Sequence, residues 1–320
     1  MNNPIRWGVL GASNFAREQM APAIHAASGA KLVALATSSP EKAAPFQQFQ
    51  PDLRVHASYD ALLADPDIDA VYVPLPNHLH VEWTLKALEA GKHVLCEKPL
   101  AMQADQFDAV IAKRDATGLL AAEAYMIVHH PQWQMAKSLY ASGAIGKLAL
   151  VDSVFTYNNP DQSNIRNRPE TGGGSLPDIG VYTFGSARFV TGEEPSAVQP
   201  HIRRENGVEV FAHITADFPS FRYSSVTSMR MFNRQYMAFH GDKGVMHLTC
   251  PFNANVFGAA ELTLEKGGMV VETYRWPGEN HYVNQVENFG HALRTGDAYP
   301  CPLEFSKGTQ AMIDMVNAAE

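Results

Sequence analysis

The amino-acid sequence predicts an α/β protein of two domains. The first is a doubly wound parallel sheet, and the second is an α+β domain with a large, mostly antiparallel sheet. Short apolar runs alternate with helical stretches up to residue 122, and long β-rich segments dominate after it. A chain of 320 residues is also longer than one hydrophobic core usually accommodates. We therefore expect domains at residues 1–122 and 123–320.

Composition and charge exclude several classes of protein. Hydrophobic residues make up 46% and charged residues 18%, which is a globular composition. A net charge of −8 without a Lys/Arg cluster argues against nucleic acid as a partner. We find neither the pattern of a signal peptide nor a run of ~20 apolar residues, so we expect no membrane partner. Three scattered cysteines without a CxxC motif are typical of a reducing compartment, so we expect a cytoplasmic enzyme or binding protein.

The first predicted strand, residues 5–10, runs directly into a glycine-containing loop. The fingerprint G-x-G-x-x-G/A between a strand and a helix holds the pyrophosphate of a dinucleotide. Gly11 and Ala16 occupy its first and last positions, and the small Ser13 replaces the middle glycine. A second strand at residues 31–36 completes a Rossmann-type βαβ unit. The predicted dinucleotide contacts in this loop are Gly11, Ser13, Asn14 and Phe15.

The segment after the second strand bears on the choice between NAD and NADP. NAD enzymes usually present Asp or Glu there to the ribose 2′-hydroxyl. This chain has no acid at the strand tip, and Glu41, beyond Pro40, is expected to be an exposed helix residue. Ser38, Ser39 and Lys42 offer hydroxyls and an ammonium that suit a 2′-phosphate. NADP is therefore favoured, with NAD as the alternative.

The rest of the first domain continues as alternating strands and helices. Predicted strands cover residues 54–56, 70–73, 93–96 and 119–122, and predicted helices cover residues 59–64, 81–90 and 103–117. Two strands run into polar, proline-bounded segments, residues 74–80 and 97–99. Because the carboxyl ends of parallel strands share the ligand edge of a sheet, we expect both segments at one site. The predicted cofactor contacts there are Pro76, Asn77, His80, Glu97 and Lys98.

Lys98 is the residue around which this predicted site is organised. A lysine just beyond a buried strand is partly desolvated, which suits it to hold or move a proton. The alternative is a surface Glu-Lys pair in which Pro99 starts a helix. Glu97 and Asn77 are expected to line the nicotinamide ribose, or else to be plain loop or cap residues. His80 is expected to hold the loop that precedes it.

The second domain contains one more segment with chemical potential. Predicted strands cover residues 148–157, 197–203, 208–218, 223–231, 235–240 and 245–248, and a helix at 178–190 interrupts them. Asp178 and Tyr182 follow three glycines and lie one turn apart on this helix. A carboxylate and a phenol presented together can act as an acid/base pair, although Asp178 could instead be the N-cap. Neither histidine pair, His78 with His80 or His129 with His130, has a third ligand at motif spacing, so no metal is predicted.

These motifs together make the sequence resemble the Gfo/Idh/MocA family of oxidoreductases. The resemblance covers most of the chain. It includes the Gly11 loop, the Pro76-to-His80 segment, Glu-Lys-Pro at residues 97–99, His130-Pro131, and the run from Gly172 to Tyr182. Glu-Lys-Pro after a strand combined with D-x-G-x-[HY] further on is a specific combination. We therefore expect the fold and chemistry of that family.

The resemblance implies a nicotinamide-dependent oxidoreductase acting on a sugar, polyol or related cyclic alcohol or ketone. Lys98, Asp178 and Tyr182 would form the catalytic set, and Arg166 would join them in contacting the substrate. Inositol dehydrogenases have His at the position of Tyr182. With Tyr at this position, the chain looks more like the glucose-fructose oxidoreductase, xylose dehydrogenase and dihydrodiol dehydrogenase branch. Many relatives carry Arg where this chain has Val128, so no contact is assigned there. Relatives pair through the large sheet, which implies a homodimer or homotetramer.

Hydride transfer from an alcohol requires that the hydroxyl proton leave as the carbonyl forms. We expect Tyr182 to exchange this proton while Lys98 hydrogen-bonds the reacting oxygen and lowers the Tyr182 pKa from its usual value near ~10. Lys98 as the direct acid or base is the alternative. Asp178 would orient a sugar hydroxyl or pair with Lys98. The competing function is a non-enzymatic dinucleotide sensor, which the presence of all three residues disfavours.

Overall fold

The computed structural model describes residues 3–320, and residues 1 and 2 of the predicted first domain lie outside that range. Contacts between Cα atoms divide the chain into two units. The first unit runs to Met126 and includes His281–Lys307, and the second comprises Ile127–Asn280 and Gly308–Glu320. The boundary near residue 122 stays a prediction. The predicted domains did not anticipate that residues 281–307 return to the first unit.

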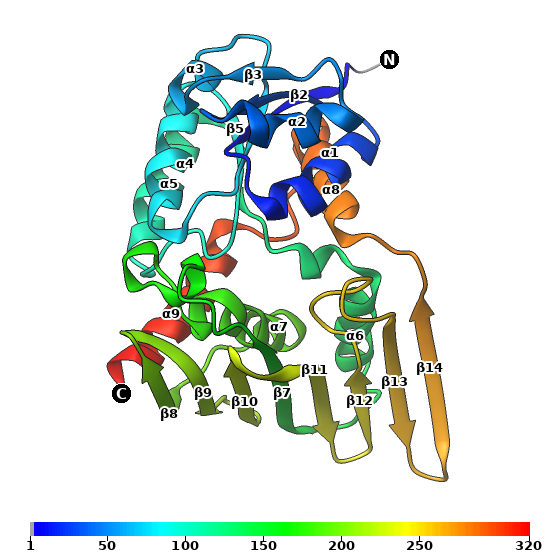
Figure 1. The fold of residues 1–320 in the computed structure, drawn as a ribbon. Helices are drawn as coiled ribbons and strands as arrows, with labels where there is room; N and C mark the ends of the chain where they lie inside the picture. Colours follow the sequence, from blue (N-terminus) through cyan, green and yellow to red (C-terminus); the bar gives the residue numbers. More distant parts are fainter. Residues whose placement is uncertain (1–2) are drawn as a thin grey trace. The chain divides into compact units, whose positions relative to one another are not determined.

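The first unit contains a six-stranded parallel sheet in the order β3-β2-β1-β4-β5-β6 (Figure 1). This is the strand order of a doubly wound dinucleotide-binding sheet, which confirms the predicted fold class. The strands are β1 (Ile5–Leu10), β2 (Ala30–Ala36), β3 (Arg54–His56), β4 (Ala70–Val73), β5 (His93–Cys96) and β6 (Ala121–Glu123). The helices are α1 (Ala21–Ala26), α2 (Pro40–Phe49), α3 (Tyr59–Leu63), α4 (His80–Glu89), α5 (Gln106–Thr117) and α8 (His281–Thr295).

The central strands of this sheet are apolar, as expected where helices cover both faces. All four residues of β4 are buried, and three of the four in β5 are buried. Such runs are typical of parallel strands that never face water. Helix α4 packs against β5 and α5, whereas α1 packs against β2 and α8 on the other face (Figure 1). The carboxyl ends of the strands are left for loops.

The second unit contains an eight-stranded sheet in the order β14-β13-β12-β11-β7-β10-β9-β8. Every neighbouring pair is antiparallel except β7 with β10. The strands are β7 (Leu148–Asn158), β8 (Ala197–Glu205), β9 (Val208–Asp217), β10 (Arg222–Ser228), β11 (Arg230–Gly241), β12 (Gly244–Leu248), β13 (Ala260–Lys266) and β14 (Val270–Trp276). This confirms the predicted, mostly antiparallel second sheet.

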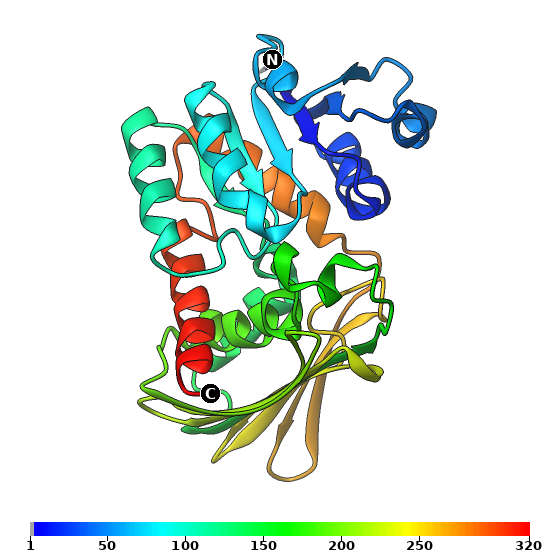
Figure 2. The same cartoon turned by 60° about the vertical axis from the view of Figure 1, so that its left-hand side comes forward.

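Helices cover one face of this second sheet (Figure 2). They are α6 (Pro131–Ala141), α7 (Val181–Thr191) and the C-terminal part of α9 (Leu303–Ala318). Residues of alternate register, such as Phe155, Tyr223 and Phe239, are buried on the covered side. Within residues 3–320 no helix is long and apolar enough to cross a membrane.

The structure departs from the predicted elements in two places. The helix predicted to begin at Asp178 is preceded by a π-helical turn at Leu176–Gly180, so Asp178 lies inside a helical turn and is not an N-cap. No elements were predicted after residue 248, where the structure has β13, β14, α8 and α9. The π turn is a choice of backbone hydrogen bonding that side-chain periodicity does not encode.

Candidate active site

Loops at the carboxyl ends of β1, β4 and β5 carry the residues predicted to bind the cofactor. Gly11 follows β1 with φ +106°, a conformation that favours glycine. A Cβ added at Gly11 would lie 3.1 Å from Leu75 Cδ2 and 3.3 Å from Tyr59 Oη. The Ser13 hydroxyl accepts a hydrogen bond from the Ala16 N–H at 3.1 Å as the chain turns into the helical segment. Gly11 thus allows the tight turn from β1 into the helical segment, which is the backbone course of a dinucleotide-binding loop.

The two other predicted residues of this loop differ in their surroundings. Asn14 is exposed, whereas Phe15 is half-buried. The Phe15 ring contacts Tyr282 of α8 edge-on, with ring centroids 5.6 Å apart. The segment that returns to the first unit therefore supports the predicted dinucleotide loop.

Glu97, directly after β5, is held by a buried phenol. The Tyr72 hydroxyl, from the middle of β4, donates to Glu97 Oε1 at 2.5 Å. Glu97 Oε2 accepts a weaker hydrogen bond from the Lys98 N–H at 3.3 Å. Burial raises the pKa of Tyr72 well above its usual value, and the Glu97 charge adds to this effect. Tyr72 therefore stays protonated and orients the carboxylate that precedes Lys98.

His80 joins the two polar segments that the sequence analysis placed at one edge. Its Nδ1 lies 2.7 Å from the Pro99 carbonyl oxygen, and its Nε2 lies 2.7 Å from the Leu75 carbonyl oxygen. The ring is fully buried. Burial lowers the pKa of His80 to about 4, although both carbonyls favour the protonated ring. A neutral ring donates through one nitrogen only, so the two carbonyls compete for one N–H.

Buried histidines should make the folded protein sensitive to mild acid. Burial lowers the pKa values of His80 and His130 to about 4 and that of His129 to about 3. Because unfolding exposes these rings at pKa values near ~6.5, the unfolded chain binds more protons below that pH. The stabilisation that comes from keeping these rings neutral should be fully present above pH ~6.5 and should be lost as the pH falls toward ~4. For His80 the free energy of unfolding should fall by about 3 kcal/mol.

Urea unfolding at pH 7 and pH 5 checks this expectation. The variant His80→Gln should lose part of the pH dependence, whereas the exposed His291→Gln should retain it. An unfolding free energy that is flat between pH 7 and pH 5 in the unmodified protein would contradict the assignment.

The segment predicted to bind the 2′-phosphate forms the N-terminus of α2. Ser38 and Lys42 are exposed, and Ser39 is the N-cap, accepting a hydrogen bond from the Lys42 N–H at 3.4 Å. The Ser39 hydroxyl also donates to Glu41 Oε2 at 2.8 Å, which lowers the pKa of Glu41. Glu41 is exposed in the first turn of α2, as expected. A 2′-phosphate bound here would replace Glu41 as the partner of Ser39.

In the second unit, the glycine run holds the segment that carries Arg166. The Gly174 N–H donates to the Arg166 carbonyl oxygen at 2.9 Å, and the Gly173 N–H donates to the Arg168 carbonyl oxygen at 3.0 Å. A Cβ at Gly173 would collide with the Arg166 backbone. The Asp178 N–H then donates to the Gly174 carbonyl oxygen at 3.2 Å. These close approaches bring the predicted residues Arg166 and Asp178 together.

Two groups converge on one oxygen of Asp178. The Tyr157 hydroxyl donates to Asp178 Oδ2 at 2.6 Å, and Arg166 Nε lies 3.0 Å from the same oxygen. Burial first, and then the Asp178 charge, raise the pKa of Tyr157, while the Asp178 charge raises the pKa of Arg166. The Arg166 side chain keeps 41% of its surface exposed, whereas the Asp178 side chain keeps 12%. Asp178 is thus an oriented carboxylate.

Tyr182 lies in an aromatic cluster of the second unit. Its ring is 5.9 Å from Phe155 and 6.0 Å from Phe252, and it is 6% exposed. Phe252 also stacks on Trp133 of α6. The Tyr182 phenol is near enough to Arg166 for the two to interact electrostatically. The ring is fixed by packing, which suits a group that must deliver a proton along one direction.

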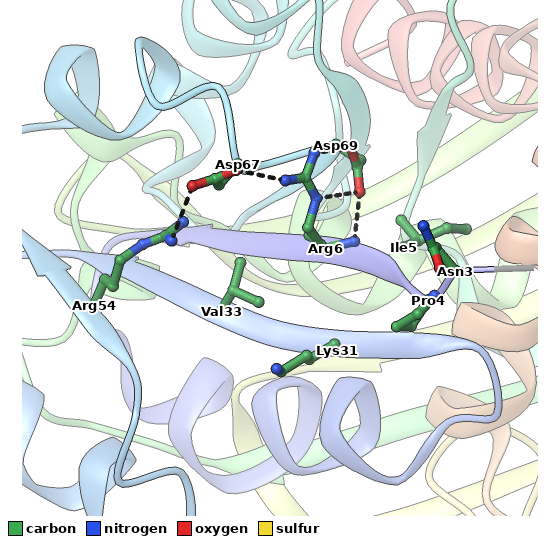
Figure 3. A pocket seen from close by; sticks show the side chains of 9 residues that line it. All are labelled: Asn3, Pro4, Ile5, Arg6, Lys31, Val33, Arg54, Asp67 and Asp69. Atoms are coloured by element: carbon green, nitrogen blue, oxygen red, sulfur yellow. Dashed lines mark hydrogen bonds and ion pairs between the residues drawn. The ribbon is translucent and has the colours of Figure 1, made fainter.

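A pocket of about 630 Å³ opens at the opposite, amino edge of the first sheet (Figure 3). It is lined by charged residues that begin β1, β2 and β3, among them Arg6, Lys31 and Arg54. None of the predicted site residues lines it. Ligands of doubly wound sheets bind at the carboxyl edge, so this pocket is not our candidate for the active site.

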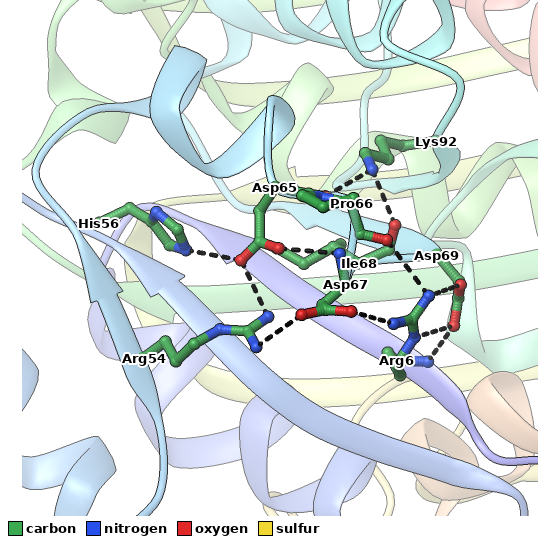
Figure 4. Close-up of polar contacts among 9 residues, drawn as sticks. All are labelled: Arg6, Arg54, His56, Asp65, Pro66, Asp67, Ile68, Asp69 and Lys92. Carbon is green, nitrogen blue, oxygen red and sulfur yellow. Dashed lines mark hydrogen bonds and ion pairs between the residues drawn. The ribbon is translucent and has the colours of Figure 1, made fainter.

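Ion pairs and hydrogen bonds link Arg6, Arg54 and Lys92 to the loop before β4 at this amino edge (Figure 4). Arg6 pairs with Asp67 and Asp69 at 2.8 Å each, and Arg54 pairs with Asp65 at 2.8 Å. Lys92 Nζ donates to the carbonyl oxygens of Asp65 and Ile68. The hydrogen bond with Arg6 lowers the pKa of Asp69. We interpret this network as a clamp on the loop before β4.

Tyr72 and Tyr157 were not singled out by the sequence analysis. Each is a hydroxyl-bearing residue inside a predicted strand, Tyr72 at 70–73 and Tyr157 at the end of 148–157. A phenol within an apolar strand that leads into a site loop was the available signal. Among residues 3–320 no group of three or more His, Cys, Asp or Glu is arranged to hold a metal ion.

Two family models match this chain. Residues 5–125 match the model described as an oxidoreductase family with an NAD-binding Rossmann fold. Residues 133–247 match the model described as the GFO/IDH/MocA C-terminal domain. The first match contains the Gly11 loop and Lys98, and the second contains Asp178 and Tyr182.

Relatives along the whole chain include two enzymes with sugar-related names. A dTDP-3,4-didehydro-2,6-dideoxy-alpha-D-glucose 3-reductase of Saccharopolyspora spinosa is 32% identical, with 100% of this chain and 97% of the relative covered. The D-xylose 1-dehydrogenase (NADP(+)) 2 of Haloferax volcanii is 33% identical, with 97% and 95% covered.

A solved structure also matches the entire fold. The 3-ketoreductase of Actinomadura kijaniata, in complex with NADP and TDP-benzene, has a TM-score of 0.89 and is 29% identical, with 99% of this chain and 98% of that chain covered. Solved variants of that protein carry replacements of a tyrosine or a lysine.

Proposed function

We propose that this chain, which belongs to the GFO/IDH/MocA oxidoreductase family, transfers a hydride between NADP(H) and a sugar-like alcohol or ketone. The chain is an oxidoreductase, and the two relatives described above are named as enzymes of a dTDP-linked sugar and of D-xylose. The observation that carries the proposal is the position of Lys98, which directly follows β5 and an oriented Glu97 at the carboxyl edge of a dinucleotide-binding sheet. NADP is the favoured cofactor, with NAD as the alternative.

The residues of the first unit suit a bound dinucleotide. At Gly11 a side chain would be disfavoured by φ +106° and by tight contacts with Leu75 and Tyr59, and in the proposal this loop holds the pyrophosphate, with Ser13, Asn14 and Phe15 around it. The nicotinamide, when bound, would supply or accept the hydride. Further contacts in the proposal come from Pro76, Asn77, His80, Glu97 and Lys98 beside the ring and from Ser38, Ser39 and Lys42 at the 2′-phosphate.

In the proposed mechanism, the chain supplies proton transfer and orientation. The Tyr182 hydroxyl gives its proton to the oxygen of the ketone as that oxygen gains charge, and regains it from the alcohol in the reverse direction. The Lys98 ammonium hydrogen-bonds the same oxygen and stabilises the phenolate. Asp178, fixed by Tyr157 and Arg166, orients a substrate hydroxyl. In the alternative, Lys98 moves the proton and Tyr182 only binds the substrate.

A binding titration followed by a turnover assay tests this function. Tryptophan quenching gives the affinities for NADPH and NADH, and free and nucleotide-linked sugars and keto-sugars are then assayed by nicotinamide absorbance. Turnover of one sugar class supports the proposal and names the substrate. Tight cofactor binding without turnover on any alcohol or ketone would favour the alternative function, a dinucleotide sensor.

Placing a carboxylate at the 2′-phosphate should reverse cofactor preference. We expect Ser38→Asp to weaken NADPH binding by about tenfold or more, equivalent to ~1.4 kcal/mol, because like charges repel. NADH binding should improve, since an acid at this place can accept a hydrogen bond from the 2′-hydroxyl. Fluorescence titration of both cofactors measures the change. Gln48→Asp adds the same charge at an exposed position of α2 and should leave the preference unaltered; a preference for NADH in the unmodified protein would refute the assignment.

We also propose a homodimer or homotetramer that pairs through the uncovered face of the eight-stranded sheet. Leu150, His240 and Val271 lie in one row across this face, and Leu150 and Val271 are 37% and 59% exposed. Sedimentation should give two or four times 35.1 kDa, and Leu150→Glu should shift it toward the monomer. The exposed Val256→Glu serves as the control.

The three free thiols support a reducing, cytoplasmic location.

A further inference from the structure

Glu209 is a buried carboxyl group of the second unit that the proposed mechanism does not use. It lies near the start of β9, paired in register with Arg204 of β8, and only 6% of its surface is exposed. A carboxyl group removed from water is costly unless hydrogen bonds and an opposite charge compensate it. The groups that contact Glu209 therefore indicate why it is retained there.

The first contact of Glu209 is with the helical turn that presents Asp178. Glu209 Oε1 accepts a hydrogen bond from the N–H of Leu176 at 3.0 Å, and Leu176 is the first residue of the π turn. Ser175 precedes this turn without capping it, and its hydroxyl lies 3.2 Å from the hydroxyl of Thr227. A carboxyl group from a distant strand thus takes the place of an N-cap, where negative charge is favoured.

The second contact of Glu209 is with the glycine run. Gly174 has φ +132°, and a Cβ added there would collide with the Glu209 carboxyl group. The same glycine donates its N–H to the Arg166 carbonyl oxygen at 2.9 Å and accepts the Asp178 N–H at 3.2 Å. Glu209 therefore packs against the residue that ties Arg166 to Asp178, and it also bonds to the turn that carries Asp178.

The ion pair of Glu209 does not explain its burial. Arg204 Nη1 lies 3.4 Å from Glu209 Oε2, and the same guanidinium also pairs with Glu320. The Arg204 side chain keeps 39% of its surface exposed, whereas the Glu209 side chain keeps 8%. A carboxyl group at the surface could pair with this exposed arginine equally well. The inward position of Glu209 is explained if its task is to hold the turn.

We propose that Glu209 is a positioning residue for the reaction, which fixes the start of the turn that presents Asp178 and keeps this carboxylate aligned with Arg166. Its effect on turnover rests on the proposed function, in which Asp178 orients a substrate hydroxyl. Its hold on the turn does not depend on that function and is measurable without any substrate.

Replacing Glu209 by alanine should loosen the turn and misplace Asp178. Hydrogen exchange followed by mass spectrometry should be faster in peptides that cover residues 172–180 of Glu209→Ala, with no substrate present. The value of kcat should fall by about ten- to a hundredfold, as expected when an orienting group moves, and the KM for the sugar-like substrate should rise. The KM for the cofactor should change little, because the predicted cofactor contacts lie in the first unit.

Three further variants separate positioning from stability. Glu209→Gln keeps an oxygen for the Leu176 N–H, so it should restore most of the slow exchange and most of kcat. Asp217→Ala removes another acid of β9, which pairs with an arginine of β10. Ile214→Ala opens a cavity at a buried position of the same strand and should lower the melting temperature. Neither control should change kcat or the exchange of residues 172–180.

Normal exchange of residues 172–180 in a folded Glu209→Ala variant overturns the inference. Faster exchange with unchanged kcat and unchanged KM for the sugar-like substrate also overturns it, as does a glutamine variant that restores neither exchange nor kcat. If alanine is not tolerated, Glu209→Asp decides, because its shorter side chain should withdraw from Leu176. Exchange and kcat should then change in the same directions as with alanine, by less, and unchanged values overturn the inference.

Failure of the proposed function would look different. If the unmodified protein turns over no sugar-like substrate but exchange rises in Glu209→Ala and not in Asp217→Ala, the proposed function fails. The hold of Glu209 on the turn then stands.

Discussion

Replacing Lys98 by alanine should lower kcat by about a hundredfold or more, the usual scale for a positioned proton-transfer group. The reaction needs a cation beside the oxygen that gains or loses a proton, and alanine supplies none. Cofactor affinity should change much less, because the pyrophosphate is expected at Gly11 and not at Lys98. Steady-state rates with the best substrate, together with NADPH titration, measure both effects.

A matched variant controls for the loss of a lysine charge. Lys86 lies in α4 of the same unit and pairs with Glu82 at the surface. Lys86→Ala should therefore keep near-normal turnover and cofactor binding. If Lys98→Ala retained most of its turnover, the central role given to Glu97-Lys98-Pro99 would be wrong.

The first sheet and its ligand edge were predictable because their signals are local. The apolar runs at β1, β4 and β5 are followed at once by Gly11, by the segment from Pro74 and by Glu97-Lys98-Pro99. The position of a loop at the carboxyl end of a parallel strand follows from chain order alone. The same reasoning placed Lys98 and His80 near one another, and the structure links their segments through His80.

The remaining features depend on register and on distant parts of the chain. Tyr72 reaches Glu97 only because β4 and β5 are neighbours in register, and Glu123 reaches Leu100 in the same way through β6. The contact of Tyr157 with Asp178 needs the glycine run to fold back on residues 166–168. The return of α8 to the first unit has no local signal, because its apolar face identifies a helix but not its partner.

Replacing Tyr182 by phenylalanine should lower turnover about as severely as Lys98→Ala. The ring keeps its packing against Phe155 and Phe252 and loses only the acidic hydroxyl, so folding should survive. If Tyr182 exchanges the proton, alcohol oxidation in the unmodified protein requires the deprotonated phenol, and its rate should rise toward alkaline pH. The variant should lose that alkaline requirement. Rates of oxidation across a pH series, with thermal melting as a check on folding, give the measurement.

The double variant and a control decide between the two proton carriers. Lys98→Ala combined with Tyr182→Phe should cost little more than either change alone, because groups that act as a unit are not additive. Tyr223→Phe removes another buried hydroxyl of the second unit, one bonded to Ser153, and should keep the normal pH profile. If Tyr182→Phe retains the profile and most of the rate, the phenol is a binding group. The proton would then travel through Lys98, and the alkaline requirement should disappear in Lys98→Ala instead.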